Sequence, residues 1–311
     1  MAQELTAPGG DQTRAIHALE RAVACAERGE PDRPIVLVRR EDVERIAALD
    51  LRSGLDRVIM GEHADAGLDS LLATGMLGAL MPEVGAMVGF GDGEWRHKDV
   101  WKHTKQVVGQ SVGRLEVRWA ALFHDIGKVR TRTISPSGEV HFFGHAEVGA
   151  RMFDKLEKRE HLFSKEESLR DAVRFLVLHH LRASQYDGKW TDSAVRRFAR
   201  EMGAHLDDLL CLSRADITTK RPEKKRRGIA MIDELAQRIG TLAEEDARLP
   251  LLPTGIGNEI MTAFALPPSR RIGEIKRALE AAVAAGEVPA REEPLFYIEY
   301  LRANAARYGL G

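Results

Sequence analysis

Residues 119–128 read Trp-Ala-Ala-Leu-Phe-His-Asp-Ile-Gly-Lys, and this stretch decides the fold. Its first five residues, Trp119 to Phe123, are uncharged and are typical of the end of a buried helix. His124 and Asp125 follow directly, although an unpaired carboxylate is among the least favourable groups to bury. A metal ion would satisfy the imidazole and the carboxylate together. The stretch therefore predicts a helical core with a metal site at the end of its central helix.

Helical periodicity continues on both sides of this stretch. Apolar residues recur at helical spacing in Asp11–Gly29, Arg40–Asp50, Asp99–Arg114, Leu115–Gly127, Gly144–Glu157, Lys165–His180, Leu206–Thr218, Asn258–Leu266, Arg271–Ala285 and Phe296–Tyr308. Short apolar pieces in residues 54–90 predict short packed helices. Thr191 has N-cap chemistry for a further helix, and Lys220–Arg227 leads into one that continues through Ile239.

Few segments favour strands. Val129–Ile134 and Val140–Phe143 flank the turn Ser135–Gly138 and predict one small hairpin near residues 130–143. Ile35–Val38 is either a short strand or a packed connector. Because these strands are too few for a sheet core, the sequence predicts an all-α fold.

The apolar pattern is interrupted by glycines and charges near Phe90–Arg96, which indicates a domain boundary. The sequence has no internal repeat and no low-complexity tract. We expect an N-terminal helical region at residues 1–92, a metal-binding domain at 93–248 and a C-terminal helical body at 249–311.

The composition of the 311 residues is that of a soluble globular protein, with 44% hydrophobic and 30% charged residues. The net charge of −1 excludes non-specific binding of polyanions by the whole surface, so that any contact with nucleic acid must be local. Cys25 and Cys211 form no pair motif, as expected of thiols in a reducing cytoplasm. Neither a signal peptide at Met1–Gly10 nor a membrane span is apparent. The oligomeric state does not follow from the sequence.

Metal-competent side chains recur on the apolar faces or ends of the predicted helices. They are His103, His124, Asp125, His145, the pair His179-His180, and Asp216. A single histidine on a helix face is more often a hydrogen-bonded core or surface residue than a ligand. Several helical segments that each carry an imidazole or a carboxylate on the apolar side favour a shared metal site. Either His179 or His180 fits, because the stripes that lead to both are apolar.

Imidazole and carboxylate ligands without thiolate suit Mn²⁺, Fe²⁺, Co²⁺, Ni²⁺, Zn²⁺ or Mg²⁺. Five or more ligands exceed the need of one tetrahedral ion, so we expect two ions that share Asp125. Two such ions hold a bridging hydroxide and clamp a phosphoryl group. Basic residues that could contact a phosphate are Lys128, Arg132, Arg182, Arg196 and Arg197. The alternative for each arginine is a solvated surface charge.

The order His103, His124-Asp125 and Asp216 resembles the HD superfamily of metal-dependent phosphohydrolases. The resemblance is closer to the HD domain of bacterial CCA-adding tRNA nucleotidyltransferases. It is carried by Asp-Val-Trp-Lys-His-Thr (99–104), Arg-Trp-Ala-Ala-Leu-Phe-His-Asp-Ile-Gly-Lys (118–128), Phe-Phe-Gly-His-Ala-Glu-Val-Gly (142–149), Trp-Thr-Asp-Ser-Ala-Val-Arg-Arg-Phe (190–198) and Arg-Ala-Asp (214–216). Leu68–Val88 is similar to that family's neck helices, and Gly257–Val288 to its body.

The resemblance implies a phosphohydrolase acting on nucleotide phosphoesters, with 2′,3′-cyclic nucleotides or RNA ends as the leading substrates and 2′-nucleotidase or general phosphatase activity as alternatives. His103, His124, Asp125 and Asp216 would hold one ion. Asp125, His145 and His179 or His180 would hold the second, while Lys128 and Arg182 stabilise charge on the phosphoryl oxygens. The family's catalytic head has no counterpart in residues 1–40, so nucleotidyl transfer is not expected.

Two other functions fit parts of the pattern. An RNA-binding module with a structural metal site would use the basic segment Lys220–Arg227, whose alternative is a solvated helix start. A di-iron oxygenase, as in myo-inositol oxygenase, shares the ligand set. The arginines near the predicted site favour phosphate over a neutral polyol.

Overall fold

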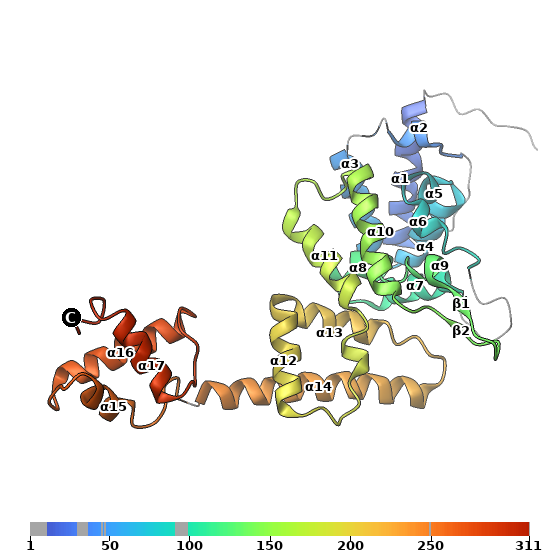
Figure 1. The fold of residues 1–311 in the computed structure, drawn as a ribbon. Helices are drawn as coiled ribbons and strands as arrows, with labels where there is room; N and C mark the ends of the chain where they lie inside the picture. The colour runs from blue at the N-terminus through green and yellow to red at the C-terminus, as the bar shows by residue number, and fades with distance from the viewer. Residues whose placement is uncertain are drawn as a thin grey trace, which may run out of the picture. The chain divides into compact units, whose positions relative to one another are not determined.

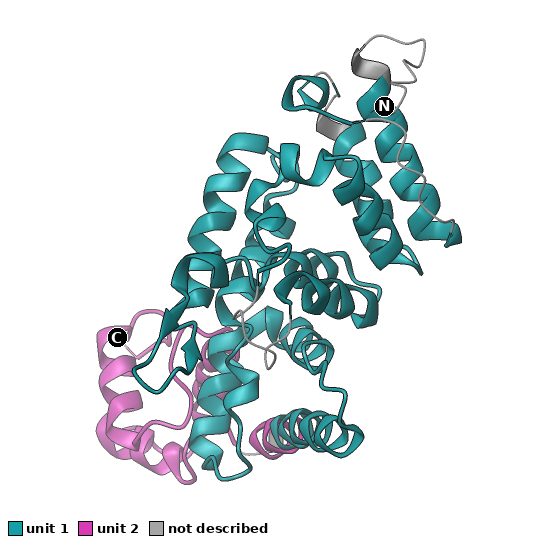
Figure 2. Cartoon of the chain, turned by 90° about the vertical axis from the view of Figure 1, so that its right-hand side faces the viewer, with its two compact units in different colours: residues 1–239 teal, residues 240–311 magenta. Residues whose placement is uncertain are grey.

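The computed structural model describes residues 11–29, 37–44, 46, 48–90, 99–248 and 250–310. Within these ranges the regular structure is helical apart from one two-stranded antiparallel hairpin, which confirms the predicted all-α class (Figure 1). The chain divides into two compact units, Met1–Ile239 and Gly240–Gly311 (Figure 2). The predicted domain boundaries at residues 92/93 and 248/249 stay predictions.

The N-terminal part of the first unit consists of helices. They are α1 (Asp11–Arg28), α2 (Arg40–Val43), α3 (Ala48–Met60), α4 (Ala64–Ala73), α5 (Met76–Leu80) and α6 (Pro82–Gly85). Glycines let α1 and α4 pack closely, since a Cβ at Gly67 would lie 2.6 Å from the Ala26 side chain and 2.8 Å from the Ala22 carbonyl oxygen.

The elements that carry the predicted site follow in the same unit. They are α7 (Val100–Gln110), α8 (Leu115–Phe123), α9 (Lys128–Thr131), β1 (Thr133–Ile134), β2 (Val140–His141), α10 (His145–Glu160), α11 (Glu167–His179), the 3₁₀ turns η1 (Ala183–Gln185) and η2 (Gly203–His205), α12 (Asp192–Met202), α13 (Leu206–Ala215) and α14 (Pro222–Arg248), whose last residues belong to the second unit. The predicted N-cap is confirmed, since Thr191 Oγ1 accepts a hydrogen bond from the Ala194 amide at 3.2 Å.

Helix α8 lies at the centre of the first unit, where it contacts α3, α7, α11 and α13. Its residues from Val117 to Phe123 are all buried, and apart from Arg118, whose guanidinium donates to the Ile59 carbonyl at 3.0 Å, they are uncharged on every face of the helix. Trp119 packs on Phe123 at 5.6 Å and on Phe163 at 5.2 Å, measured between ring centroids. The indole N–H of Trp119 donates to Asp56 at 2.7 Å, so that its polar atom is also satisfied.

The second unit contains the end of α14 together with α15 (Ile256–Ala263), α16 (Arg270–Ala284) and α17 (Pro294–Ala303). Its core includes Ile260, Leu279, Tyr297 and Leu301, each of which is fully buried. The Tyr297 hydroxyl donates to the Pro289 carbonyl at 2.9 Å, which satisfies the polar end of this buried ring.

Several predicted boundaries were wrong. Helix α8 ends at Phe123 rather than Gly127, because residues 124–127 form tight turns in which the Ile126 amide donates to the Phe123 carbonyl and the Lys128 amide to that of Asp125. The hairpin is shorter than predicted, because Val129 lies in α9. The segments Met1–Gly10, residues 30–36 and residues 91–98, on which some predictions fall, lie outside the described residues. No helix among the described residues is both long enough and apolar enough to span a bilayer.

Candidate metal centre

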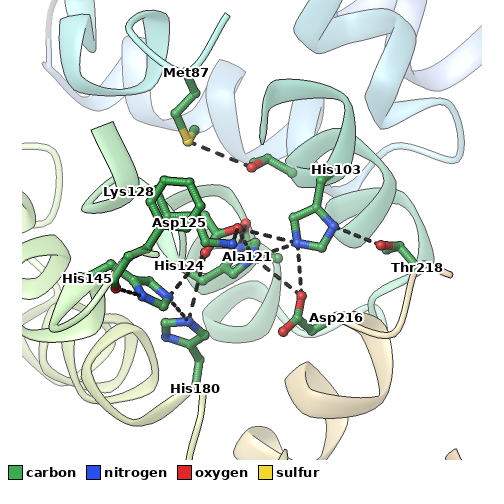
Figure 3. Close-up of polar contacts among 12 residues, drawn as sticks. Met87, His103, Ala121, His124, Asp125, Lys128, His145, His180, Asp216 and Thr218 are labelled. Atoms are coloured by element: carbon green, nitrogen blue, oxygen red, sulfur yellow. Dashed lines mark hydrogen bonds and ion pairs between the residues drawn. The ribbon is translucent and has the colours of Figure 1, made fainter. Parts of the chain in front are cut away.

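Two sequence-adjacent residues at the end of α8 lie at the middle of the predicted site. His124 and Asp125 are each 1% exposed. Figure 3 shows the two side chains among those of His103, His145, His180 and Asp216, which come from α7, from α10 and from the residues that follow α11 and α13. The end of the central helix therefore places a buried imidazole and a buried carboxylate side by side, as its sequence predicts.

A first group of ligand atoms gathers around Oδ2 of Asp125. Nε2 of His103, on α7, lies 3.4 Å from this oxygen, and Nε2 of His124 lies 3.3 Å from it. The two Nε2 atoms are 3.2 Å apart. Asp216 follows the last residue of α13, and its Oδ1 lies 2.9 Å from the Nε2 of His103 and 3.6 Å from that of His124. Four side chains from three parts of the chain thus converge on one point.

A second group gathers around the other carboxylate oxygen of Asp125. Oδ1 lies 3.5 Å from Nε2 of His145, the first residue of α10, and 4.0 Å from Nε2 of His180, which follows α11. The two Nε2 atoms are 3.2 Å apart. Within each of the groups His103, His124, Asp125 and Asp125, His145, His180, the ligand atoms lie within 4.8 Å of one another. Asp125 therefore belongs to both groups, one oxygen to each.

In three of the histidines, a hydrogen bond from Nδ1 to a backbone carbonyl determines that the lone pair is on Nε2. Nδ1 lies 2.7 Å from the Ala121 carbonyl in His124, and 2.8 Å from the Phe142 carbonyl in His145. In His180 it lies 2.8 Å from the Val177 carbonyl. A carbonyl oxygen can only accept, so Nδ1 donates and the lone pair of a neutral ring is on Nε2, facing the cluster.

His103 differs from the other three histidines in the hydrogen-bond partner of its Nδ1. Its Nδ1 lies 2.8 Å from the Thr218 hydroxyl, a side-chain partner. Thr218 was not among the predicted site residues, because its partner His103 lies 115 residues away in the sequence.

The donor set fits divalent cations. Imidazole nitrogens and carboxylate oxygens meet at 2.9–3.6 Å in the first group, where the lone pairs of neutral imidazoles and the carboxylates repel one another unless a proton or a metal ion lies between them. Nitrogen and oxygen ligands with outer partners on the imidazoles are typical of Mn²⁺, Fe²⁺, Co²⁺, Ni²⁺ and Zn²⁺ sites. The residues present are therefore sufficient to hold a metal.

The two groups differ in their electrostatics. Burial alone would lower the pKa of His124, but the charge of Asp125 and hydrogen bonds to Asp125 and Asp216 raise it to about 10. Burial would raise the pKa of Asp125 and Asp216, yet the facing imidazoles hold both below the usual range, and the Lys128 charge contributes at Asp125. In the second group, burial lowers the pKa of His145 and brings that of His180 to about 4.

These pKa values predict proton release when the protein binds a metal. At pH 7.5 the metal-free chain holds a proton on His124, because its pKa of about 10 lies above that pH, whereas a metal ligand must be deprotonated. We expect binding to release about one proton from His124, and the affinity to rise with pH up to the pKa. Calorimetric titration with Mn²⁺ in buffers of different ionisation enthalpy measures the release. Binding without proton release would contradict this account of the first group.

Lys128 lies beside the cluster, in the first turn of α9. Its Nζ donates to Oδ2 of Asp125 at 2.6 Å and lies 5.7 Å from the centre of the Phe142 ring. The Lys128 side chain is 23% exposed and that of Asp216 is 28% exposed, whereas that of Asp125 is 1% exposed. Solvent therefore reaches the cluster beside Lys128 and Asp216.

Gly127 sets how closely the turn after α8 approaches α10. A Cβ at this position would lie 2.0 Å from the carbonyl oxygen of His145 and 2.7 Å from the amide nitrogen of Gly149. Only a residue without a side chain allows this approach. Gly127 thereby brings the first residue of α10, with its imidazole, next to Asp125.

Other predicted residues lie outside the cluster. The His179 ring packs at a tilt against that of Phe175, with 4.3 Å between centroids, and His179 belongs to neither group of ligand atoms. Arg182 donates to Glu201 at 2.5 Å. Arg132 is exposed, Arg196 is partly buried and the side chain of Arg197 is 71% exposed. The phosphate-binding roles of these arginines stay predictions.

Residues 100–220, which carry all of these candidate ligands, match the model of the HD domain family. These residues form an HD domain. The predicted kinship with tRNA nucleotidyltransferases is also confirmed. The chain is 32% identical over 257 residues to the A-adding tRNA nucleotidyltransferase of Deinococcus radiodurans, which covers 80% of this chain and 57% of the relative. It is 31% identical over 262 residues to the CC-adding tRNA nucleotidyltransferase of Thermus thermophilus, which covers 82% and 57%.

The chain also aligns with the multifunctional CCA protein of Azoarcus sp. This alignment is shorter, with 30% identity over 129 residues, or 40% of this chain. The chain spans a little over half the length of the two longer-matching relatives. Because those two alignments are longer than residues 100–220, the similarity extends beyond the HD domain.

Proposed function

We propose that this chain is a metal-dependent phosphohydrolase that acts on nucleotide phosphoesters. The observation that carries the proposal is the convergence of four imidazole Nε2 atoms on the two oxygens of Asp125, with Lys128 beside them. A purely structural site would need neither this many ligands nor a solvent-accessible ammonium group.

The residues divide into two sets of ligands. His103, His124, Asp125 and Asp216 would hold one ion, and Asp125, His145 and His180 a second. Bound ions supply Lewis acidity that polarises a phosphoryl oxygen and lowers the pKa of water. Lys128 keeps the Asp125 carboxylate in position and places a positive charge where the phosphoryl group enters.

The substrate class follows from the relatives, whose names describe enzymes that add nucleotides to tRNA. A nucleotide or an RNA end is therefore the leading substrate, and we propose 2′,3′-cyclic nucleotides first, with 2′-nucleotides and general phosphomonoesters as alternatives. The predicted cytoplasmic location is part of this proposal, since Cys25 and Cys211 form no pair motif in the sequence.

Metal analysis of the purified protein, followed by a substrate panel, tests the proposal. Samples loaded with Mn²⁺, Ni²⁺ or Co²⁺ are assayed with 2′,3′-cyclic nucleotides, with 2′-, 3′- and 5′-mononucleotides, with deoxynucleoside triphosphates and with p-nitrophenyl phosphate. We expect the highest kcat/KM with a cyclic nucleotide or a 2′-nucleotide. Absence of turnover in every metal-loaded sample would reject the proposed hydrolase.

A second candidate function is RNA binding, which the basic segment Lys220–Arg227 favours. Within it, Lys220, Arg221, Lys224, Arg226 and Arg227 are exposed. The segment begins four residues after Asp216, and a nearby cationic stretch of this kind binds phosphate groups in a salt-dependent way. Replacing Lys224 and Arg227 with Glu should weaken binding of a tRNA and flatten its salt dependence. Unchanged tRNA affinity would leave the segment as a solvated helix start.

A further inference from the structure

The hairpin that precedes α10 presents an aromatic pair to solvent. Phe143 is 76% exposed, and its ring lies nearly parallel to that of His141, with 5.0 Å between centroids and 14° between planes. His141 ends β2 and Phe143 lies in the turn before α10, so that the two rings meet where the chain leaves the hairpin. A phenyl ring held flat against a second ring, and still open on its other side, has the shape of a stacking surface.

This pair is held by the same residues that build the metal centre. The carbonyl of Phe142 binds Nδ1 of His145 at 2.8 Å, and the Phe142 ring contacts both Lys128 Nζ and Phe90. Phe142 is therefore fixed by contacts on two sides, and Phe143 is the next residue along the chain. An exposed ring thus lies two residues from a predicted ligand, on backbone that the ligand itself anchors.

The charge around the pair is suited to a nucleotide. Exposed Arg132 directly precedes β1, whose Thr133 pairs with His141, and Lys128 and exposed Arg130 lie in α9 just before it. Glu139, after the turn, lies 3.9 Å from the Nε2 of His141 and is an acidic neighbour of the pair. Aromatic side chains interleaved with arginines are the usual means of holding an unpaired base and its phosphates.

We infer that His141 and Phe143 form a stacking platform for a base of the substrate, while the phosphoester of the same nucleotide lies at the HD centre. The inference rests on the proposed function and names the part of the substrate that is recognised. It predicts a preference for base-bearing phosphoesters over phosphoesters that have the same reacting group and no base.

The test compares Phe143→Ala with Phe143→Trp in the 311-residue, Mn²⁺-loaded chain. For 2′,3′-cyclic AMP we expect Phe143→Ala to raise KM about tenfold with little change in kcat, because base stacking on one aromatic ring is worth that much. Phe143→Trp should restore KM. Ile134→Ala is the matched control, since Ile134 is also exposed (61%) on this hairpin and should not affect KM.

A second measurement separates this inference from the proposed hydrolase. Binding of a dinucleotide that contains 2-aminopurine quenches the fluorescence of that base when it stacks. Quenching by the wild type that Phe143→Ala removes would support the platform, even if no substrate were hydrolysed. Equal KM values and equal quenching in wild type and Phe143→Ala would overturn it, as would absence of both hydrolysis and quenching in the wild type. A change of oligomeric state in Phe143→Ala would instead assign this surface to contact between copies of the chain.

Discussion

Replacing Asp125 with Asn is expected to abolish binding at both groups of ligands and to lower hydrolysis of the best substrate by a factor on the order of 10⁴. The reason is geometric. One oxygen of Asp125 faces His103 and His124, and the other faces His145 and His180, so that a single carboxylate serves both. Asn keeps the shape of the side chain but removes the negative charge.

Variants that affect only one group sharpen this prediction. Asp216→Asn should weaken binding at the first group, and His145→Ala at the second, each leaving part of the metal content in place. Asp154→Asn is the control, because this carboxylate is on α10 but pairs with Arg174 at the surface. Metal content by mass spectrometry and kcat/KM are the measurements. Full activity in Asp125→Asn would refute the assignment of the site.

Replacing Gly127 with Ala is expected to destabilise the chain and to remove metal from the second group, although position 127 contributes no ligand. The added Cβ would lie 2.0 Å from the His145 carbonyl oxygen, so that the start of α10 must move. Forcing atoms into a filled interior destabilises by about 1–3 kcal/mol. The same displacement takes Nε2 of His145 away from Asp125.

Gly109→Ala is the matched control for this substitution. Gly109 lies in α7, and a Cβ there would have no heavy atom within 4 Å. Alanine inside a helix is favoured over glycine by about 0.5–1 kcal/mol, so the melting temperature should stay the same or rise. The measurements are thermal unfolding and metal content for both variants. A Gly127→Ala protein with the wild-type melting temperature and full metal content would show that the close approach has no such role.

The motif at residues 119–128 was enough to predict the helical class and the central place of His124 and Asp125. It was not enough to choose between His179 and His180. Neighbouring residues on a helix point about 100° apart, and the rotation of α11 is set by packing that the sequence does not display. In the structure His180 lies with the ligand atoms, while His179 packs on Phe175.

Interactions between residues that are far apart in the sequence could not be predicted from it either. Arg182 was selected for its position after His180, yet its partner in the structure, Glu201, lies 19 residues further along the chain. Thr218 was missed because a hydroxyl residue gives no signal until its partner His103, 115 residues away, is placed beside it. The end of α8 was predicted too late, because turns of the kind at residues 124–127 use the same residue types as a helix.

The groups that bind Nδ1 of the four histidines differ in whether a mutation can remove them. His124, His145 and His180 each bind a backbone carbonyl three residues earlier, and no substitution at that earlier position deletes its carbonyl. Among these four histidines, only His103 depends on a side chain, that of Thr218. During divergence, the metal affinity of the first group can therefore be tuned by one codon at position 218. That of the second group is protected by the main chain itself.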